Sequence, residues 1–267
     1  MNKRVKLYIA KILELGQSVG IETHFPLIKF CVLSNSKNDS GHNLEHVYAV
    51  VKLGVELAEA KGWKGTRNMD IVFYGCLMHD MGCRWNRDRH HIESAELAED
   101  LLKSFCNDDM NNEMIREIVK CCLEHRSSYA AGPSTEMSEV VALADRGKPD
   151  FFITVMRAFN FREKDGIPQH EMVDKVYEHL LDKYSETTGY NWKSYSKAGL
   201  ELFAAEWAEF HRLMQRRNVR YLVDIYATQY IKTGKTKPVT SVAEMNSGIF
   251  SRGNQNRTII FEGESAE

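Results

Sequence analysis

The sequence has no surplus of charge of either sign and no long apolar run, and both absences narrow its function. Its 267 residues include 35 lysines and arginines and 37 acidic residues, for a formal net charge of −2. A nearly neutral chain has no overall attraction for nucleic acid, so an anionic ligand must be held by a local group of basic side chains. No apolar stretch reaches the roughly 18 residues that a membrane-spanning helix requires.

Cysteine pairs with metal-binding spacing are also missing. The six cysteines include no Cys-x-x-Cys pair, and several lie in apolar runs, as buried thiols do. The first residues, MNKRVKLYIAKILELGQ, are interrupted by Lys11 and Glu14 and lack a small-residue cleavage site, unlike a signal peptide. These features predict a reducing, cytoplasmic location.

Alternation of apolar and polar residues, the pattern of a half-buried strand, is absent over any convincing length. Helical spacing takes its place. Val47, Val51 and Val55 recur on one stripe that ends at Gly62. Residues 68–82 are apolar on nearly every side and predict a central helix. Comparable helical periodicity marks residues 91–105, 111–125 and 134–147. The sequence therefore predicts an all-α fold.

The helical pattern continues beyond residue 150 and predicts a division of the chain. A long helix is expected from about Ser196 to Arg217, and another ends near Gly234. The last residues are rich in Gly, Asn and Ser. We expect a main domain over residues 1–188 with its motif core at 40–150, a helical extension over 189–234, and a tail over 235–267 that is flexible or docked on a partner. The aromatic residues of the extension suit packing against the core or a second copy of the chain.

A histidine and an aspartate, His79 and Asp80, stand side by side at the end of the apolar run IVFYGCLM. Burying either side chain costs free energy unless something pairs with it. Other apolar helical segments deliver His46, His125 and Asp145 in the same way. Imidazole nitrogens and carboxylate oxygens are preferred ligands of divalent transition metals, and a mixed set without thiolates leaves room for a catalytic water. The pattern predicts a metal site.

The stretches GHNLEHVYAV, CLMHDMG and ALADRG resemble the HD phosphohydrolase superfamily over roughly residues 40–150. The resemblance implies an HD-domain helical bundle and a first set of metal ligands, namely His46, His79, Asp80 and Asp145. One branch of the superfamily writes its first motif as Gly-His-Asp-x-x-His-x-x-Arg-Val. This chain departs from that branch at Asn43 and Ala49.

Some members of the superfamily bind a second ion through two further histidines. His90 and His125 fall where those ligands would be, with His91 as the alternative to His90. Asp80 would then bridge the two ions. We expect one ion, and a second if both histidines are ligands. Mn²⁺, Fe²⁺, Zn²⁺, Co²⁺ and Ni²⁺ all suit these groups.

The resemblance implies hydrolysis of a phosphate ester or anhydride by a metal-activated water, with Asp80 at the catalytic centre. His42 and Glu93 are the candidates for donating a proton to the leaving group. Six basic residues near the ligands are candidates for binding the substrate phosphate. They are Arg84, Arg87, Arg89, Arg126, Arg146 and Lys148.

A small nucleotide or a nucleotide-derived phosphate is the expected substrate, and the enzyme would be a nucleotidase, a triphosphohydrolase or a phosphodiesterase. The alternative is a metal-containing module that senses a nucleotide without turnover and passes the signal through the C-terminal helices. Hydrolysis assays on a panel of nucleotides separate the two hypotheses.

Overall fold

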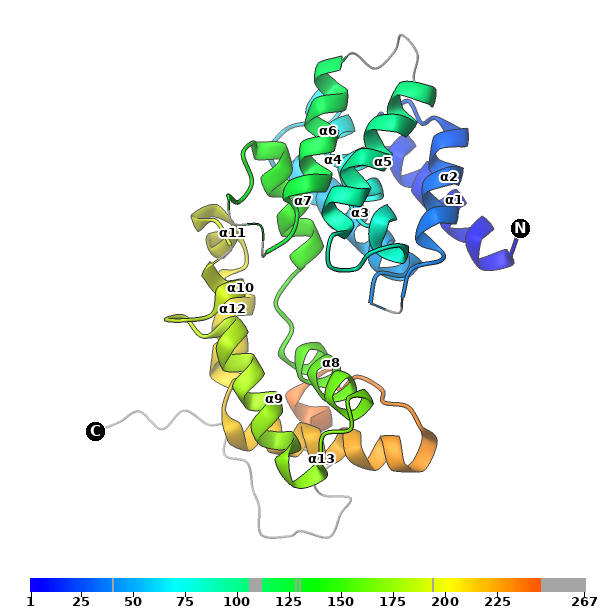
Figure 1. The fold of residues 1–267 in the computed structure, drawn as a ribbon. Coiled ribbons are helices and arrows are strands. Elements are labelled where there is room, and N and C mark those ends of the chain that lie inside the picture. Colours follow the sequence, from blue (N-terminus) through cyan, green and yellow to red (C-terminus); the bar gives the residue numbers. More distant parts are fainter. Residues whose placement is uncertain (40, 106–111, 128, 130, 194, 246–267) are drawn as a thin grey trace. The chain divides into compact units, whose positions relative to one another are not determined.

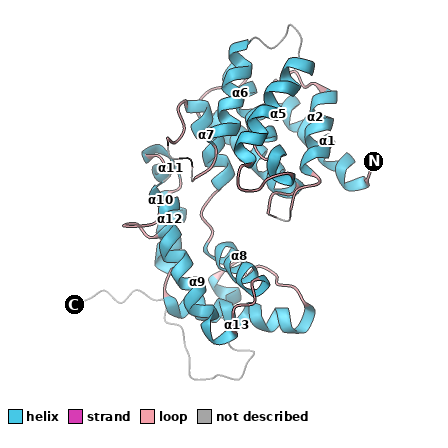
Figure 2. Cartoon of the chain, in the orientation of Figure 1, coloured by secondary structure: helices cyan, strands magenta, loops and turns pink. Residues whose placement is uncertain are grey.

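The computed structural model describes residues 1–39, 41–105, 112–127, 129, 131–193 and 195–245. Within these residues the chain is helical and forms no strand (Figures 1 and 2). The predicted all-α class is therefore confirmed. The chain divides into two compact units. Unit 1 comprises residues 1–147 and 194–196, and unit 2 comprises residues 148–193 and 197–267. Among the described residues, no helix combines the length and apolar character needed to cross a membrane.

Unit 1 is a bundle built around one buried helix. Its helices are α1 (Lys3–Ser18), α2 (Phe25–Asn35), α3 (Leu44–Ala60), α4 (Arg67–Met78), α5 (His90–Phe105), α6 (Asn112–Glu124) and α7 (Glu136–Arg146), with the short 3-10 helix η1 (Met81–Arg84) after α4. Helix α4 packs against α3, α6 and α7. Every residue of α4 from Ile71 to Met78 is buried. This is the central helix that its continuous apolar sequence predicts.

Side-chain caps determine where two of the site-bearing helices begin. The Asn43 side chain accepts a hydrogen bond from the His46 backbone N–H at 3.1 Å, so His46 lies in the first turn of α3. Thr135 and Ser138 form a reciprocal capping box at the start of α7. That helix ends at Arg146, which places Asp145 in its last turn.

Unit 2 consists of α8 (Phe151–Lys164), α9 (Gln169–Tyr184), α10 (Tyr190–Lys193), α11 (Lys197–Leu202), α12 (Ala204–Leu213) and α13 (Arg216–Thr233). Helices α8, α9 and α13 pack against one another. The single long helix predicted from Ser196 to Arg217 is wrong. The chain leaves the helical conformation at the buried Phe203 (φ −106°, ψ 26°), and α12 ends at Leu213.

The observed division between the two units lies at a different residue from the predicted domain boundary. The division falls after Gly147 rather than at residue 188, because α8 and α9 pack with α13 of the predicted extension. Part of the predicted tail is docked on unit 2 of the same chain. Val239 and Met245 are buried, and the Val239 N–H donates to Tyr226 Oη at 3.4 Å. Residues 246–267 of that tail lie outside the described part of the chain.

Gly75 on α4 tests how tightly the central helix is packed. A Cβ there would lie 2.8 Å from Cys121 Cβ and 3.1 Å from Val141 Cγ2. We expect Gly75→Ala to lower the free energy of unfolding by about 1–3 kcal/mol through overpacking, although alanine is the better helix former. Urea denaturation measures the change. Glu56→Ala, on the exposed side of α3, is the control and should change stability by less than about 0.5 kcal/mol. A Gly75→Ala protein as stable as the wild type would contradict this packing.

Candidate metal centre

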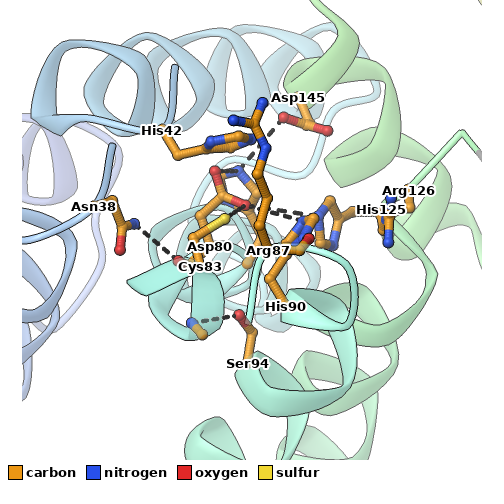
Figure 3. A network of polar contacts seen from close by, with 12 residues as sticks. Asn38, His42, Asp80, Cys83, Arg87, His90, Ser94, His125, Arg126 and Asp145 are labelled. Atoms are coloured by element: carbon orange, nitrogen blue, oxygen red, sulfur yellow. Dashed lines mark hydrogen bonds and ion pairs between the residues drawn. The ribbon is translucent and has the colours of Figure 1, made fainter. Parts of the chain in front are cut away.

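Six side chains from separate helix ends of unit 1 meet in one cluster. His46 comes from the first turn of α3, and His79 and Asp80 link α4 to η1. The first residue of α5 is His90, His125 directly follows α6, and Asp145 lies in the last turn of α7. Figure 3 shows Asp80 at the centre of this group. The sequence interpretation named all six as candidate ligands, and the structure brings them together.

One oxygen of the Asp80 carboxylate faces the first pair of histidines. Asp80 Oδ2 lies 3.3 Å from His46 Nε2 and 3.2 Å from His79 Nε2. Asp145 Oδ1 lies 3.2 Å and 3.5 Å from the same two nitrogens. The ligand atoms of His46, His79 and Asp145 are all within 4.8 Å of one another. Two imidazoles and two carboxylates thus surround one position, a donor set that suits a divalent transition metal.

The other oxygen of Asp80 faces a second pair of histidines. Asp80 Oδ1 lies 3.4 Å from His90 Nε2 and 3.8 Å from His125 Nε2, and the two nitrogens are 3.1 Å apart. Asp80, His90 and His125 form a second group whose donor atoms lie within 4.8 Å of one another. His91, the rival of His90, instead has its ring beside that of Tyr129. The Asp80 carboxylate therefore stands between two donor sets.

Backbone hydrogen bonds orient three of the imidazoles. In each case Nδ1 lies 2.7 Å from the carbonyl oxygen three residues earlier, and the pairs are His79 with Cys76, His90 with Arg87, and His125 with Cys122. A carbonyl oxygen only accepts, so Nδ1 carries the proton. In the neutral ring Nε2 then presents its lone pair to the cluster, which is the tautomer that a metal-binding histidine needs.

Several buried polar atoms of the cluster have no hydrogen-bond partner. They are His46 Nε2, His79 Nε2 and Asp80 Oδ2. The side chains of His79 and Asp80 are 0% and 1% exposed. A buried polar atom left without a partner is costly, and buried charge is more so. These atoms converge on one place and have the chemistry of metal ligands, so the residues present fit a divalent cation.

The electrostatics of the two donor sets differ. Burial opposes charge on Asp80, yet the positive charge on His79 and the neighbouring His46 imidazole hold the pKa of Asp80 well below its usual range. Burial would lower the pKa of His79, but the charges of Asp80 and Asp145 raise it well above its usual value. Burial lowers the pKa of His125 to about 3. Without a metal, the first set therefore holds protons while His125 stays neutral.

The end of α2 and the loop that follows it support the turn that carries His79 and Asp80. Asn35 Nδ2 donates to the Leu77 carbonyl at 3.1 Å, and Asn38 Nδ2 donates to the Asp80 carbonyl at 2.9 Å. These bonds fix the backbone on both sides of His79. Sequence reasoning missed both asparagines, because a polar run such as NSKND is indistinguishable from an ordinary solvated loop.

His42 lies beside both donor sets. Its ring centroid is 5.9 Å from that of His46 and 5.7 Å from that of His90. Asp39, a second residue that sequence reasoning missed, lies with Oδ1 2.9 Å from His42 Nδ1. Glu93, the other predicted proton donor, is partly buried on α5 and packs its Cβ near Gly82. The structure thus places His42 next to two of the clustered histidines, a proximity that its sequence position does not reveal.

The predicted phosphate-binding residues have varied surroundings. Arg87 Nη1 donates to Asp39 Oδ2 at 3.0 Å, and Arg126 donates to the Asp88 carbonyl. In the view of Figure 3 the Arg87 side chain overlies the cluster and Arg126 is drawn next to His125. The Arg84 guanidinium lies 3.5 Å from the centroid of the Trp85 ring.

The remaining three basic residues are engaged elsewhere or exposed. Arg89 is exposed. The Arg146 guanidinium lies over the ring of Tyr195, 5.5 Å from its centroid. Lys148 belongs to unit 2 and pairs with Glu206 there at 3.5 Å. Arg87 and Arg126 are therefore the best placed of the six to meet a ligand at the cluster.

Comparison with known proteins agrees with this arrangement. Residues 43–148 match the HD domain family. This range contains all six clustered side chains, from His46 to Asp145. This match supports the resemblance to the HD-domain superfamily of metal-dependent phosphohydrolases.

The chain is also similar to an uncharacterized protein of Methanocaldococcus jannaschii. The two are 27% identical over 152 residues, which cover 54% of this chain and 55% of that protein. The chain therefore spans about half the length of this relative. No solved structure matches the chain.

Metal binding should release protons and weaken at low pH. The pKa values of His46 and His79 are raised in the metal-free protein, so these rings hold their protons to a higher pH than an ordinary imidazole does. A cation must displace those protons, so we expect its affinity to fall as the pH drops from about 8 to about 6. Isothermal titration with Mn²⁺ or Co²⁺ in buffers of different protonation enthalpy measures both effects. His170→Ala, at an exposed site, is the control. Affinity that rose as the pH fell would contradict this expectation.

Proposed function

We propose that the chain hydrolyses a phosphate ester or anhydride bond of a nucleotide or nucleotide-derived substrate. The observation that carries the proposal is the Asp80 carboxylate, whose two oxygens face two separate histidine pairs at 3.2–3.8 Å. A carboxylate shared in this way is the natural bridge of a two-metal hydrolytic site. The match of residues 43–148 to the HD domain family supports the reaction class.

The residues have distinct roles in this proposal. His46, His79, Asp80 and Asp145 would hold one ion, and Asp80 with His90 and His125 would hold a second if both histidines are ligands. When bound, a divalent transition metal lowers the pKa of a coordinated water and polarises a phosphoryl oxygen. Mn²⁺, Fe²⁺, Zn²⁺, Co²⁺ and Ni²⁺ are all compatible with these ligands. His79, Asp80 and His125 are themselves buried, which limits the access of bulk water to these ligands.

Arg87 and Arg126 are proposed to bind the substrate phosphate. Arg87 donates to one oxygen of the Asp39 carboxylate, and a phosphate oxygen accepts from a guanidinium in the same way. Trp85 supports a nucleotide substrate. Its side chain is 53% exposed, and Arg84 stacks on its ring, so an exposed indole stands next to the arginine-rich segment. A base can stack on such a surface.

His42 is the proposed proton donor to the leaving group. Asp39 engages its Nδ1 at 2.9 Å, which leaves Nε2 to serve the substrate. Glu93 remains the alternative donor. A reducing compartment is also part of the proposal, because Cys76, Cys83, Cys121 and Cys122 are buried free thiols.

Loss of the bridging carboxylate should abolish turnover. We expect Asp80→Ala to reduce hydrolysis by at least about 100-fold and to lose metal binding, because it removes an oxygen from both donor sets. Phosphate release and chromatography on nucleoside mono- and triphosphates and cyclic nucleotides, with each divalent ion in turn, measure activity. Circular dichroism checks the helical content. Full activity in Asp80→Ala would contradict the mechanism, and nucleotide binding without product under every ion would instead favour a sensor.

The leaving group distinguishes a proton donor from a structural histidine. A 4-nitrophenyl phosphate ester needs little protonation of its leaving oxygen, whereas an alkyl or ribosyl phosphate ester needs it. We expect His42→Ala to slow the poor leaving group about 100-fold and the nitrophenyl ester much less. Equal losses of activity on both substrates would show that His42 is not the proton donor. Glu93→Gln, tested in parallel, would show whether Glu93 has that role.

A further inference from the structure

Tyr195 lies far beyond the HD domain in sequence, yet it packs on the end of that domain. Residues 148–193 belong to unit 2, whereas Tyr195 belongs to unit 1. Its side chain is buried, at 6% exposure. Its hydroxyl donates a hydrogen bond to the Gly147 carbonyl at 3.0 Å. The contact joins positions that are 48 residues apart in the chain.

The partner of this hydrogen bond lies just after a proposed metal ligand. Gly147 caps the C-terminal end of α7 with φ 69°, a positive value that suits glycine, and its N–H donates to the Leu143 carbonyl at 2.9 Å. Helix ends fray because their last carbonyls lack partners within the helix. The Arg146 guanidinium also lies over the Tyr195 ring. One side chain therefore contacts both residues that follow Asp145.

The position of Asp145 depends on this last turn of α7. Asp145 Oδ1 lies 3.2 Å from His46 Nε2 and 3.5 Å from His79 Nε2, whereas the other members of that donor set come from α3 and the end of α4. If the last turn of α7 loosened, only Asp145 would leave the set. A contact that holds this turn therefore controls whether the first donor set is complete.

We propose that Tyr195 is a positioning residue for Asp145, so that the first metal position is completed by a side chain from outside residues 43–148. The inference rests on the proposed role of Asp145 as a metal ligand. It also has a reciprocal consequence. If Tyr195 raises the affinity for the cation, then the cation stabilises the Tyr195 contact by the same factor. Occupancy of the metal site is thereby coupled to the segment that follows α10.

The test uses the full chain and Co²⁺ as the probe. Tyr195→Phe keeps the buried ring and removes only the hydroxyl, and Tyr195→Ala removes both. We expect the Co²⁺ dissociation constant to rise about 3- to 10-fold in Tyr195→Phe and about 10- to 100-fold in Tyr195→Ala. Titration calorimetry and the visible spectrum of bound Co²⁺ report it. Tyr190→Phe, an exposed tyrosine five residues earlier, is the matched control and should bind Co²⁺ as the wild type does.

A second measurement separates positioning from simple stabilisation. Amide hydrogen exchange in the last turn of α7 should slow when Co²⁺ binds the wild-type protein, and slow less in Tyr195→Phe. A merely structural role would lower the melting temperature equally with and without Co²⁺ and leave the dissociation constant unchanged. That result would overturn the inference while the proposed function stood. A wild-type protein that bound none of the divalent ions would overturn both.

Discussion

The buried negative charge of Asp80 is the constraint on which the rest of unit 1 depends. The side chain is 1% exposed, and four imidazoles stand around it at 3.2–3.8 Å. A carboxylate removed from water must be neutralised, and here either protonated histidines or cations can do so. The helices must therefore deliver four rings to one place. The arrangement of α3 to α7 follows from this requirement as much as from apolar packing.

Helix ends rather than helix middles supply the groups around that charge. His46 stands in a first turn set by the Asn43 cap, His79 ends α4, and Asp145 occupies a last turn. Helix ends are also where the backbone has unused donors and acceptors. The same few residues therefore satisfy the helix termini and aim the side chains inward. Packing of α4 against its neighbours holds those ends at a fixed separation.

The sequence was informative wherever a pattern was local. Helical periodicity located α3 to α7, and polar residues on or at the ends of apolar runs identified five of the six clustered side chains. The sixth, His90, came from the resemblance to the HD phosphohydrolases. A single contact between residues far apart in the chain leaves no such pattern in the sequence. Nothing in the periodicity distinguishes Asn38, Asp39 or Tyr195 from solvated residues, because each acts through one contact with a distant partner. The break at Phe203 was missed for a similar reason, since its burial overrides the local helical preference.

The hydrogen bonds from imidazole Nδ1 to the carbonyl three residues earlier make the orientation of three histidines independent of distant parts of the chain. The aim of His79, His90 and His125 is set within four consecutive residues of each segment. The carbonyl of Arg87 lies in the loop before α5, but no residue outside these four-residue segments takes part in the three bonds. Insertions between these helices can therefore lengthen the chain without turning a ring away, so new substrate contacts can be grafted beside an unchanged centre.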